Sequence, residues 1–259
     1  TWLCFLDADD RYVPGAFRAM LDASVGCDLV WSAYETPDGA FGELGAQGRI
    51  APREAIRAFV DPRGYEQADG RFGIGRGVLC RSAWAKLIRA DLVVPNGIVF
   101  PEGLFKGEDG LFSLRCIAHA REIGYVGRPA YYWDTSCSKT CVRFERRHSR
   151  ALGDYAACCW PYLEAELRSG VLLDSDVMRL IAREAASTLS DAATKGGRLR
   201  ETAQMLAPVF GMAEVRHSLG SIGSLSRVRE LTWGAEARLL RAGHIGVALV
   251  LERLGAALK

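Results

Sequence analysis

The chain has 259 residues, of which 49% are apolar and 25% are charged, and its formal net charge is +2. This length accommodates one large domain, or a domain with a helical extension. The near-neutral charge and scattered basic residues exclude a phosphate-tracking surface, so we expect no nucleic-acid partner. We expect neither a membrane-spanning helix, which needs roughly 20 apolar residues, nor a signal peptide.

The eight cysteines do not form the pattern of a disulfide scaffold, and several lie inside apolar runs. Small buried thiols of this kind are typical of a reducing compartment. Cys137 and Cys141, and Cys158 with Cys159, have no second pair at ligand spacing. We therefore predict no zinc site.

The opening stretch joins an apolar run, residues 2–6, to three carboxylates, Asp7, Asp9 and Asp10. This pattern predicts a buried strand whose end opens into a polar site. Three close carboxylates repel one another, and a divalent cation or a row of donors relieves that repulsion. Ligands of open α/β sheets bind beyond the carboxyl ends of strands, which favours a functional role here.

Several interpretations of this acidic stretch compete. A calcium loop is excluded, because Arg11 and Tyr12 occupy the fifth and sixth positions, where an oxygen ligand and glycine are required. A phosphatase with Asp7 as its nucleophile remains open. An Asp-rich turn that caps the next helix also remains open.

Four elements are predicted after this stretch. Residues 14–21 have a proline in the first turn and an apolar stripe, which predicts a helix. Residues 28–34 predict a strand, and residues 35–50, rich in glycine, proline and acidic side chains, predict a surface loop. Residues 52–60 predict a short helix.

The middle of the chain contains a glycine-rich segment, residues 73–77, that resembles a dinucleotide fingerprint only superficially. Its spacing is G-x-G-x-G and no βαβ unit surrounds it. A strand is predicted at 78–80 and a helix at 83–89, with Ser82 as its N-cap. Residue preferences favour Trp84 as a core aromatic.

A second acidic pair, Glu108 and Asp109, follows Gly107 and precedes apolar residues at helical spacing through Ala120. The pair therefore lies at a predicted helix N-terminus. There the macrodipole and free N–H groups favour the ionised carboxylate, ready to accept a proton. Plain helix capping is the alternative, because acids are common in a first turn.

Two short strands are predicted at 122–126 and 129–133, and the sequence beyond residue 142 is helical. The helices are expected at 151–169, 174–195, 198–209 and 226–258. The last is basic and amphipathic, which favours either contact with a membrane surface or packing on the catalytic domain or another subunit. A non-catalytic scaffold with this helical tail is a further alternative.

The two acidic motifs together resemble family 2 glycosyltransferases with the GT-A fold. The resemblance rests on Asp7-Ala8-Asp9-Asp10 between an apolar strand and a helix, on Phe100-Pro101-Glu102-Gly103, and on Glu108-Asp109 with Phe112 three positions later. It implies an α/β fold in which residues 1–141 form a partial, Rossmann-like GT-A domain and 142–259 a helical extension. We expect the domain to be N-terminally truncated, because the family's first strand-helix units precede the Asp-x-Asp strand.

The resemblance also implies an activity and a site. The activity is inverting transfer of a sugar from a nucleotide-diphosphate donor to an acceptor hydroxyl, in cell-surface polysaccharide or glycoconjugate synthesis. Asp109 would be the catalytic base with Glu108 beside it, and Asp7, Asp9 and Asp10 would hold Mn2+ or Mg2+. The expected substrate-binding residues are Trp84, Lys86, whose charge would screen phosphate, Glu102, Ser138 and Lys139.

The expected partners follow from the same resemblance. They are a nucleotide-sugar donor and a glycan or lipid-linked acceptor. We expect the protein in the cytoplasm, with peripheral contact on the inner face of the membrane.

Overall fold

The computed structural model describes residues 1–41, 48–60, 81–135, 143–220 and 228–257. The chain divides into two compact units. The first, here the sheet unit, comprises Thr1–Gly103, Gly107–Ser138 and Arg168–Leu172. The second, here the helical unit, comprises Leu104–Lys106, Lys139–Leu167 and Leu173–Lys259. The boundary expected after residue 141 lies outside the described residues. Two short segments, 104–106 and 168–172, belong to a different unit from their neighbours in the chain.

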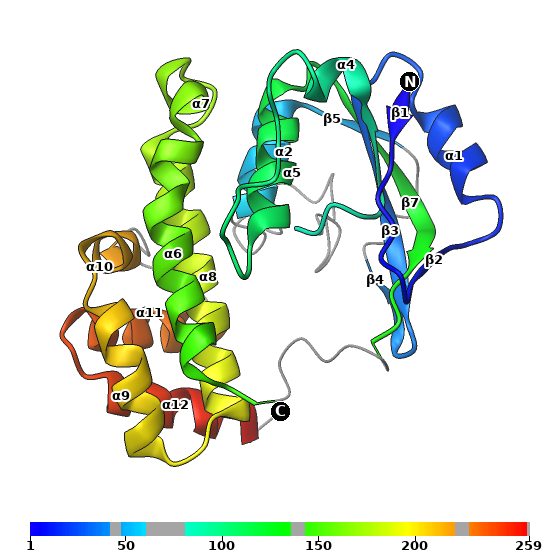
Figure 1. Cartoon of the computed structure of the whole chain (residues 1–259). Helices are drawn as coiled ribbons and strands as arrows, with labels where there is room; N and C mark the ends of the chain where they lie inside the picture. Colours follow the sequence, from blue (N-terminus) through cyan, green and yellow to red (C-terminus); the bar gives the residue numbers. More distant parts are fainter. Residues whose placement is uncertain (42–47, 61–80, 136–142, 221–227, 258–259) are drawn as a thin grey trace. The chain divides into compact units, whose positions relative to one another are not determined.

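The sheet unit is built on one mixed sheet, which has seven strands in the described residues (Figure 1). Along its main path the strands are β1 (Trp2–Leu3), β6 (Lys86–Arg89), β3 (Leu29–Thr36), β7 (Ile123–Tyr132) and β2 (Arg11–Tyr12), while β4 (Gly39–Phe41) pairs with β3 and β5 (Gly48–Ile50) with β7. The central pair, β3 and β7, is parallel, and the other pairs are antiparallel. The acidic stretch therefore lies between two short strands on opposite edges of this path.

The strand predicted at 28–34 is confirmed as β3, but other predictions for the sheet are wrong in detail. The buried opening strand is reduced to the two half-buried residues of β1 on the sheet edge, and Leu6 beyond it is 56% exposed. The loop expected at 35–50 contains β4 and β5. The two strands expected at 122–126 and 129–133 form one strand, β7, with irregular register against β3 near its middle.

The helix predicted at 83–89 is wrong, because residues 86–89 form β6. Ala85, directly before it, has a φ of 59°, which is outside the helical region. Lys86, Leu87 and Ile88 then pair with β3. Sheet pairing with a distant segment has overridden the local helical spacing.

Helices cover both faces of the sheet (Figure 1). Helix α1 (Ala16–Ala23) packs Met20 and neighbouring alanines against one face. On the other face lie α2 (Pro52–Val60), as predicted, and α5 (Glu108–His119), with a short α4 (Ala90–Val93) following β6. The rings of Phe59 in α2 and Trp31 in β3 are 6.4 Å apart. Glu108 and Asp109 therefore begin a helix that lies on this face of the sheet.

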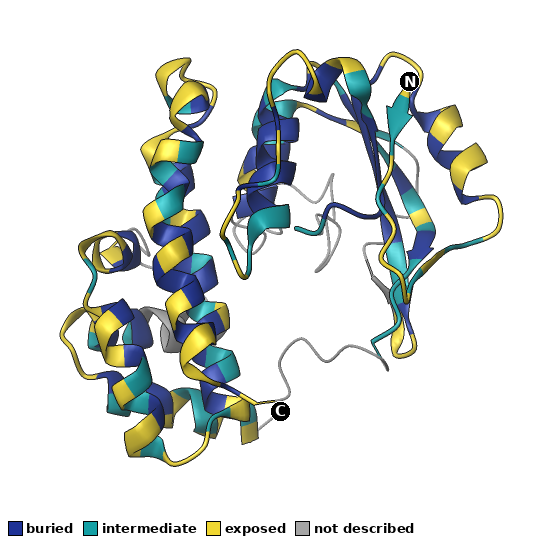
Figure 2. Ribbon diagram, viewed as in Figure 1, coloured by how far each residue is buried: buried dark blue, intermediate teal, exposed yellow. Residues whose placement is uncertain are grey.

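The helical unit contains helices in all four expected regions beyond residue 142, with corrected limits, and α10 in addition. They are α6 (Arg146–Tyr162), α7 (Glu164–Arg168), α8 (Asp174–Lys195), α9 (Leu199–Phe210), α10 (Ala213–Gly220), α11 (Val228–Arg241) and α12 (Ile245–Ala257). The helix predicted at 174–195 is confirmed. The single helix expected at 226–258 is two helices, because Gly243 adopts a φ of 83° between them. Helices α6 and α8 each bury one side and expose the other (Figure 2).

The last helix, α12, exposes an apolar stripe. Val247 is 52% exposed and Leu254 57%, and they lie seven residues apart, on one face. Contact of this stripe with a membrane stays a prediction. Within the described part of the chain, no helix combines the length and the apolar character needed to cross a bilayer.

Candidate functional site

The acidic stretch after β1 forms a turn that is fastened to strand β7. The amide of Asp10 donates to the carbonyl of Asp7 at 3.1 Å, which closes the turn. The hydroxyl of Tyr131 donates to the Asp10 carboxylate at 2.7 Å and accepts from the Asp7 amide at 3.2 Å. The amide of Asp134 donates to the second Asp10 oxygen at 2.9 Å. Asp10 therefore holds the turn in place.

Tyr131 itself is fully buried. Burial, followed by the hydrogen bond with Asp10, raises the pKa of Tyr131 above its ordinary value. The hydroxyl therefore keeps its proton at neutral pH and remains a donor. This explains how a carboxylate can be fastened by an uncharged side chain.

Asp7 and Asp9 differ from Asp10, because both are exposed and neither carboxylate has a hydrogen-bond or ion-pair partner among the described residues. Partial burial raises the pKa of Asp7, and the charges of Asp10, Asp109 and Asp9 raise it further. Asp7 and Asp109 therefore lie close enough to influence each other, although they are far apart in the sequence. The fold brings the two acidic motifs into one site.

Asp109 is the second residue of α5, which begins after Gly107, the N-cap residue with a φ of 93°. Burial raises the pKa of Asp109, and the charge of Glu108 raises it further. A hydrogen bond from the Ala83 amide and the charge of Lys86 act in the opposite direction, but the net shift is upward. Desolvation and the neighbouring carboxylate thus oppose the helix N-terminus, which was expected to favour the ionised form of Asp109.

Lys86 has a different environment from the one expected. It is fully buried in β6, and its ammonium donates to the carbonyls of Ser82 and Trp84. The ammonium lies 5.3 Å from the ring centre of Trp31. This position does not support direct contact with a phosphate. The charge of Lys86 acts within the protein instead, where it lowers the pKa of Asp109.

Trp84 is 5% exposed, and its ring stacks on Tyr131 with ring centres 4.5 Å apart. It therefore has a core position next to the residue that fastens the acidic turn. Glu102 is exposed in the loop before α5. One carboxylate oxygen of Glu108 is buried without a hydrogen-bond partner among the described residues. The remaining candidates, Ser138 and Lys139, lie outside the described residues.

Sequence reasoning missed three groups at this site. Tyr131 fastens the acidic turn, and the backbone amide of Ala83 binds Asp109. The third is Arg81, whose guanidinium packs on the first turn of α5: its Nε would lie 3.1 Å from a Cβ placed on Gly110. Tyr131 was visible only as one aromatic in a predicted strand. The other two groups, Ala83 and Arg81, lie directly before β6, in a segment whose fold the sequence did not predict.

A metal ion would have few protein ligands here. In the described parts of the chain, no three His, Cys, Asp or Glu side chains converge in the manner of a metal centre. Both Asp10 oxygens already accept hydrogen bonds, while Asp7 and Asp9 have none. This donor set fits a cation held by one or two carboxylates together with substrate phosphates, which is how Mg2+ often binds.

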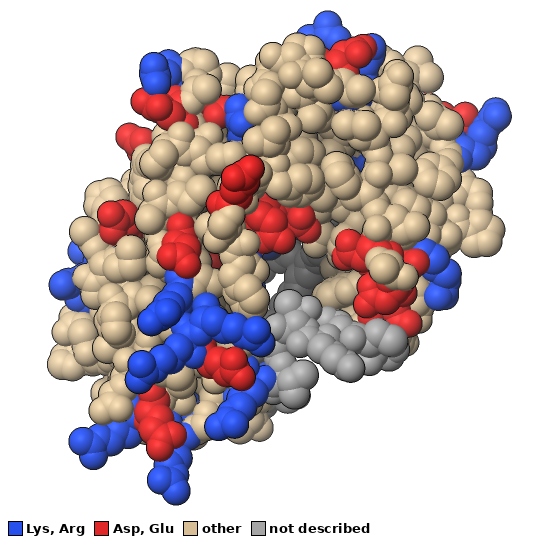
Figure 3. Space-filling view, in the orientation of Figure 1, with Lys and Arg blue, Asp and Glu red and all other residues tan. Residues whose placement is uncertain are grey.

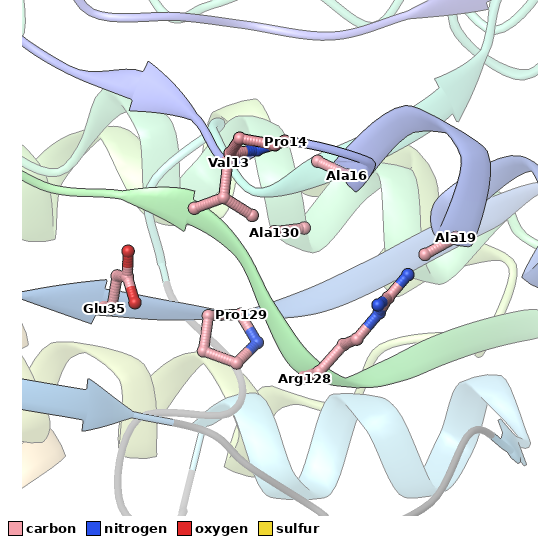
Figure 4. A pocket seen from close by; sticks show the side chains of 8 residues that line it. All are labelled: Val13, Pro14, Ala16, Ala19, Glu35, Arg128, Pro129 and Ala130. Carbon is pink, nitrogen blue, oxygen red and sulfur yellow. The ribbon is translucent and has the colours of Figure 1, made fainter.

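A separate cavity of about 350 Å³ lies between α1 and β7 (Figure 4). Its lining is mostly small and apolar, with Glu35 and Arg128 as the charged members. None of the acidic-site residues lines it. We therefore do not assign the proposed chemistry to this cavity.

Structural comparison finds a likeness of the fold to S. aureus TarS. The crystal structure of S. aureus TarS 1-349 superposes with a TM-score of 0.62 at 13% identity, covering 100% of this chain and 67% of TarS 1-349. TarS 1-349 in complex with UDP-GlcNAc gives a TM-score of 0.51 at 15% identity, covering 100% and 68%. The fold resembles that of TarS. The mixed α/β architecture, with its curled sheet and many helices, is thus shared with TarS.

A longer TarS structure extends this likeness. It gives a TM-score of 0.56 at 15% identity and covers 97% of this chain but only 39% of its own. The chain therefore spans well under half of that protein's length. No protein-family model matches the sequence, and no curated protein matches it by sequence.

Proposed function

We propose that the chain transfers a sugar from a nucleotide-diphosphate sugar to an acceptor hydroxyl with inversion, in the synthesis of a cell-surface polysaccharide or glycoconjugate. One feature carries the proposal: Asp7 and Asp109, from separate acidic motifs, are close enough in the fold for the charge of Asp109 to raise the pKa of Asp7. The proposal is supported by the likeness of the fold to TarS, whose complex with UDP-GlcNAc shows that protein binding a nucleotide sugar.

Asp109 is the proposed base. Its raised pKa makes it a stronger proton acceptor than an ordinary aspartate, while the Ala83 amide and Lys86 limit the shift and favour the ionised form. It would take the proton from the acceptor hydroxyl as that oxygen attacks the anomeric carbon. Attack on the face opposite to the leaving diphosphate inverts the configuration of that carbon.

Asp7 and Asp9 are the proposed metal ligands, with Asp10 in a supporting role. A bound Mn2+ or Mg2+ would supply positive charge to stabilise the diphosphate leaving group. The free carboxylates of Asp7 and Asp9 are suited to hold such a cation. Asp10 orients their turn through Tyr131 and the Asp134 amide.

Glu108 and Glu102 are the proposed acceptor-side groups. Glu108 lies beside the base and raises its pKa. The exposed carboxylate of Glu102 is available to accept hydrogen bonds from sugar hydroxyls. These roles place the donor near the turn after β1 and the acceptor near the start of α5.

The alternative functions gain no observation from the structure. A phosphatase that uses Asp7 as nucleophile leaves Asp109 and its environment without a role. A non-catalytic scaffold gives no role to the raised pKa of Asp7 or to that of Asp109. We therefore keep glycosyl transfer as the function that the site supports best.

The proposal is tested by incubating the full-length protein with a panel of nucleotide sugars, Mn2+ or Mg2+ and candidate glycan acceptors. Release of nucleoside diphosphate coupled to a glycosylated product is the expected result, and NMR of the new linkage should show an anomeric configuration opposite to that of the donor. A product with retained configuration contradicts the role of Asp109. Release of inorganic phosphate from phosphomonoesters would instead support the phosphatase.

A further inference from the structure

The cavity between α1 and β7 lies apart from the acidic site and has no role in the proposed reaction. All of its lining belongs to the sheet unit. Its volume of about 350 Å³ is at the lower end of the range for small-molecule sites, roughly 300–1,000 Å³. The cavity is therefore large enough for a small organic molecule and too small for a helix of a partner protein.

An irregularity of β7 shapes one end of this cavity. Ser32 of β3 lies opposite Val126 of β7, and the next residue, Ala33, lies opposite Pro129, so β7 advances by three residues where β3 advances by one. Bulges of this kind redirect a side chain and are common beside functional sites. Arg128 lies in the bulge, and its side chain extends toward α1 (Figure 4).

Two opposite charges lie at the two ends of the cavity. The Arg128 guanidinium is at one end and the Glu35 carboxylate at the other, with Pro129 and Ala130 between them (Figure 4). Within the described parts of the chain, neither charged group has a hydrogen-bond or ion-pair partner. Both charges are thus available to a ligand.

The position of these charges along the strands sets the length of the ligand. Glu35 pairs with Tyr132, which lies four residues beyond Arg128 in β7. At about 3.3 Å per residue this separation is at most about 13 Å between backbone positions, and the bulge shortens it. A ligand that reaches both groups therefore carries its charges at the two ends of a chain rather than on neighbouring atoms.

We propose that this cavity binds a small aliphatic zwitterion, with its ammonium on Glu35 and its carboxylate on Arg128. A guanidinium binds a carboxylate through two parallel hydrogen bonds, which favours this orientation. The methylene chain lies over Pro129 and Ala130 and is removed from water. A ligand with a single charge leaves one of the two protein groups desolvated and unpaired, which costs free energy. Binding does not depend on glycosyl transfer, because no acidic-site residue lines the cavity.

General attraction to surface charge is the competing explanation. Lys and Arg side chains gather over the helical unit (Figure 3), and such a group of side chains attracts anions without a built site. Hexanoate has only the anionic end of 6-aminohexanoate, and hexylamine has only the cationic end. These two compounds measure the attraction that one charge provides.

The test is an NMR titration of the full-length protein with 6-aminohexanoate, glycine, hexanoate and hexylamine. We expect 6-aminohexanoate to shift the amide signals of Val13 and Ala130, which line the cavity, and to bind about tenfold more tightly than each of the other three. Glycine is the control for length, because its two charges are too close together to reach both groups. Equal affinity for 6-aminohexanoate and hexanoate, or no saturable binding of 6-aminohexanoate, overturns the proposal.

Variants assign the two ends of the ligand. Glu35→Gln and Arg128→Gln should each weaken 6-aminohexanoate binding by about tenfold or more, while Glu35→Gln should not weaken hexanoate binding. Asp38→Asn in the turn after β3 and Arg18→Gln on the exposed face of α1 are matched controls, since neither residue lines the cavity, and both should bind as wild type does. Wild-type affinity in Glu35→Gln contradicts the proposal. The comparison of ligands needs only wild type, so it decides the proposal even where a variant fails to fold.

Discussion

Replacement of Tyr131 by phenylalanine tests how the acidic turn is held. The variant keeps the buried ring and its stacking on Trp84, so no cavity forms. It removes the 2.7 Å hydrogen bond to Asp10 and the acceptor for the Asp7 amide. The variant therefore changes only the hydrogen bonds that hold the acidic turn on β7.

The magnitude follows from the two lost hydrogen bonds. A hydrogen bond to a charged group contributes about 1.5–3 kcal/mol to stability. Asp7 is exposed, so its amide can bind water in the variant, and losing its hydrogen bond to Tyr131 adds little to the cost. Asp10 retains its bond from the Asp134 amide, which keeps the carboxylate partly satisfied. We expect the free energy of unfolding of the sheet unit to fall by about 1.5–3 kcal/mol.

Native-state hydrogen exchange of the β7 amides measures this change, because it reports the sheet unit separately from the helical unit. Tyr132→Phe is the matched control: it is the next residue of β7, and its ring contacts the Arg11 guanidinium at 3.5 Å, a contact that phenylalanine keeps. The control should lie within about 0.5 kcal/mol of wild type. Equal stabilities for Tyr131→Phe and the control would refute the fastening role.

Three further changes test the electrostatics and packing of the sheet unit. Asp109→Asn should raise the free energy of unfolding at pH 7. The pKa of Asp109 in the folded state is raised above the ordinary value of about 3.9, so wild type loses stability relative to the variant as pH rises through the folded-state pKa. Urea titrations at several pH values would measure this difference. Asp28→Asn should lower the free energy of unfolding at neutral pH, because Arg121 lowers the pKa of Asp28. The difference in stability between wild type and variant should vanish as pH falls below about 3.9 through that lowered pKa. A difference that does not depend on pH would count against the ion pair of Asp28 and Arg121. Gly124→Ala should cost about 1–3 kcal/mol in thermal unfolding, because the new Cβ would lie 2.8 Å from a backbone carbonyl at the end of α1, whereas Gly246→Ala, with open space around it, should not destabilise.

The periodicity of apolar residues predicted the secondary structure correctly where an element packs through one of its faces. Residues 52–60 and 174–195 form helices with the predicted limits, and residues 28–34 form most of β3. The acidic motifs could also be recognised in the sequence, because their meaning depends on residue type and on the turn or helix that follows. Their proximity is what the structure adds.

The failures come from interactions between distant segments. Residues 83–89 have helical spacing, but pairing with β3 and the positive φ of Ala85 make the segment a strand. That change buries Lys86 and turns an expected phosphate contact into an internal charge near Asp109. The direction of the Asp109 shift was also unpredictable, because burial depends on the tertiary fold whereas the helix N-terminus is visible in the sequence. Tyr131 shows the same limit, because its hydrogen bond to Asp10 joins residues far apart in the sequence.

The proposed base gives the most direct test of glycosyl transfer. Asp109→Asn and a control, Asp22→Asn on the exposed face of α1, should be compared with wild type in single-turnover transfer and in donor titration calorimetry with metal present. We predict that Asp109→Asn lowers the transfer rate by about 10²- to 10⁴-fold and leaves donor affinity nearly unchanged, while the control matches wild type in both. Transfer by Asp109→Asn at the wild-type rate would contradict the account.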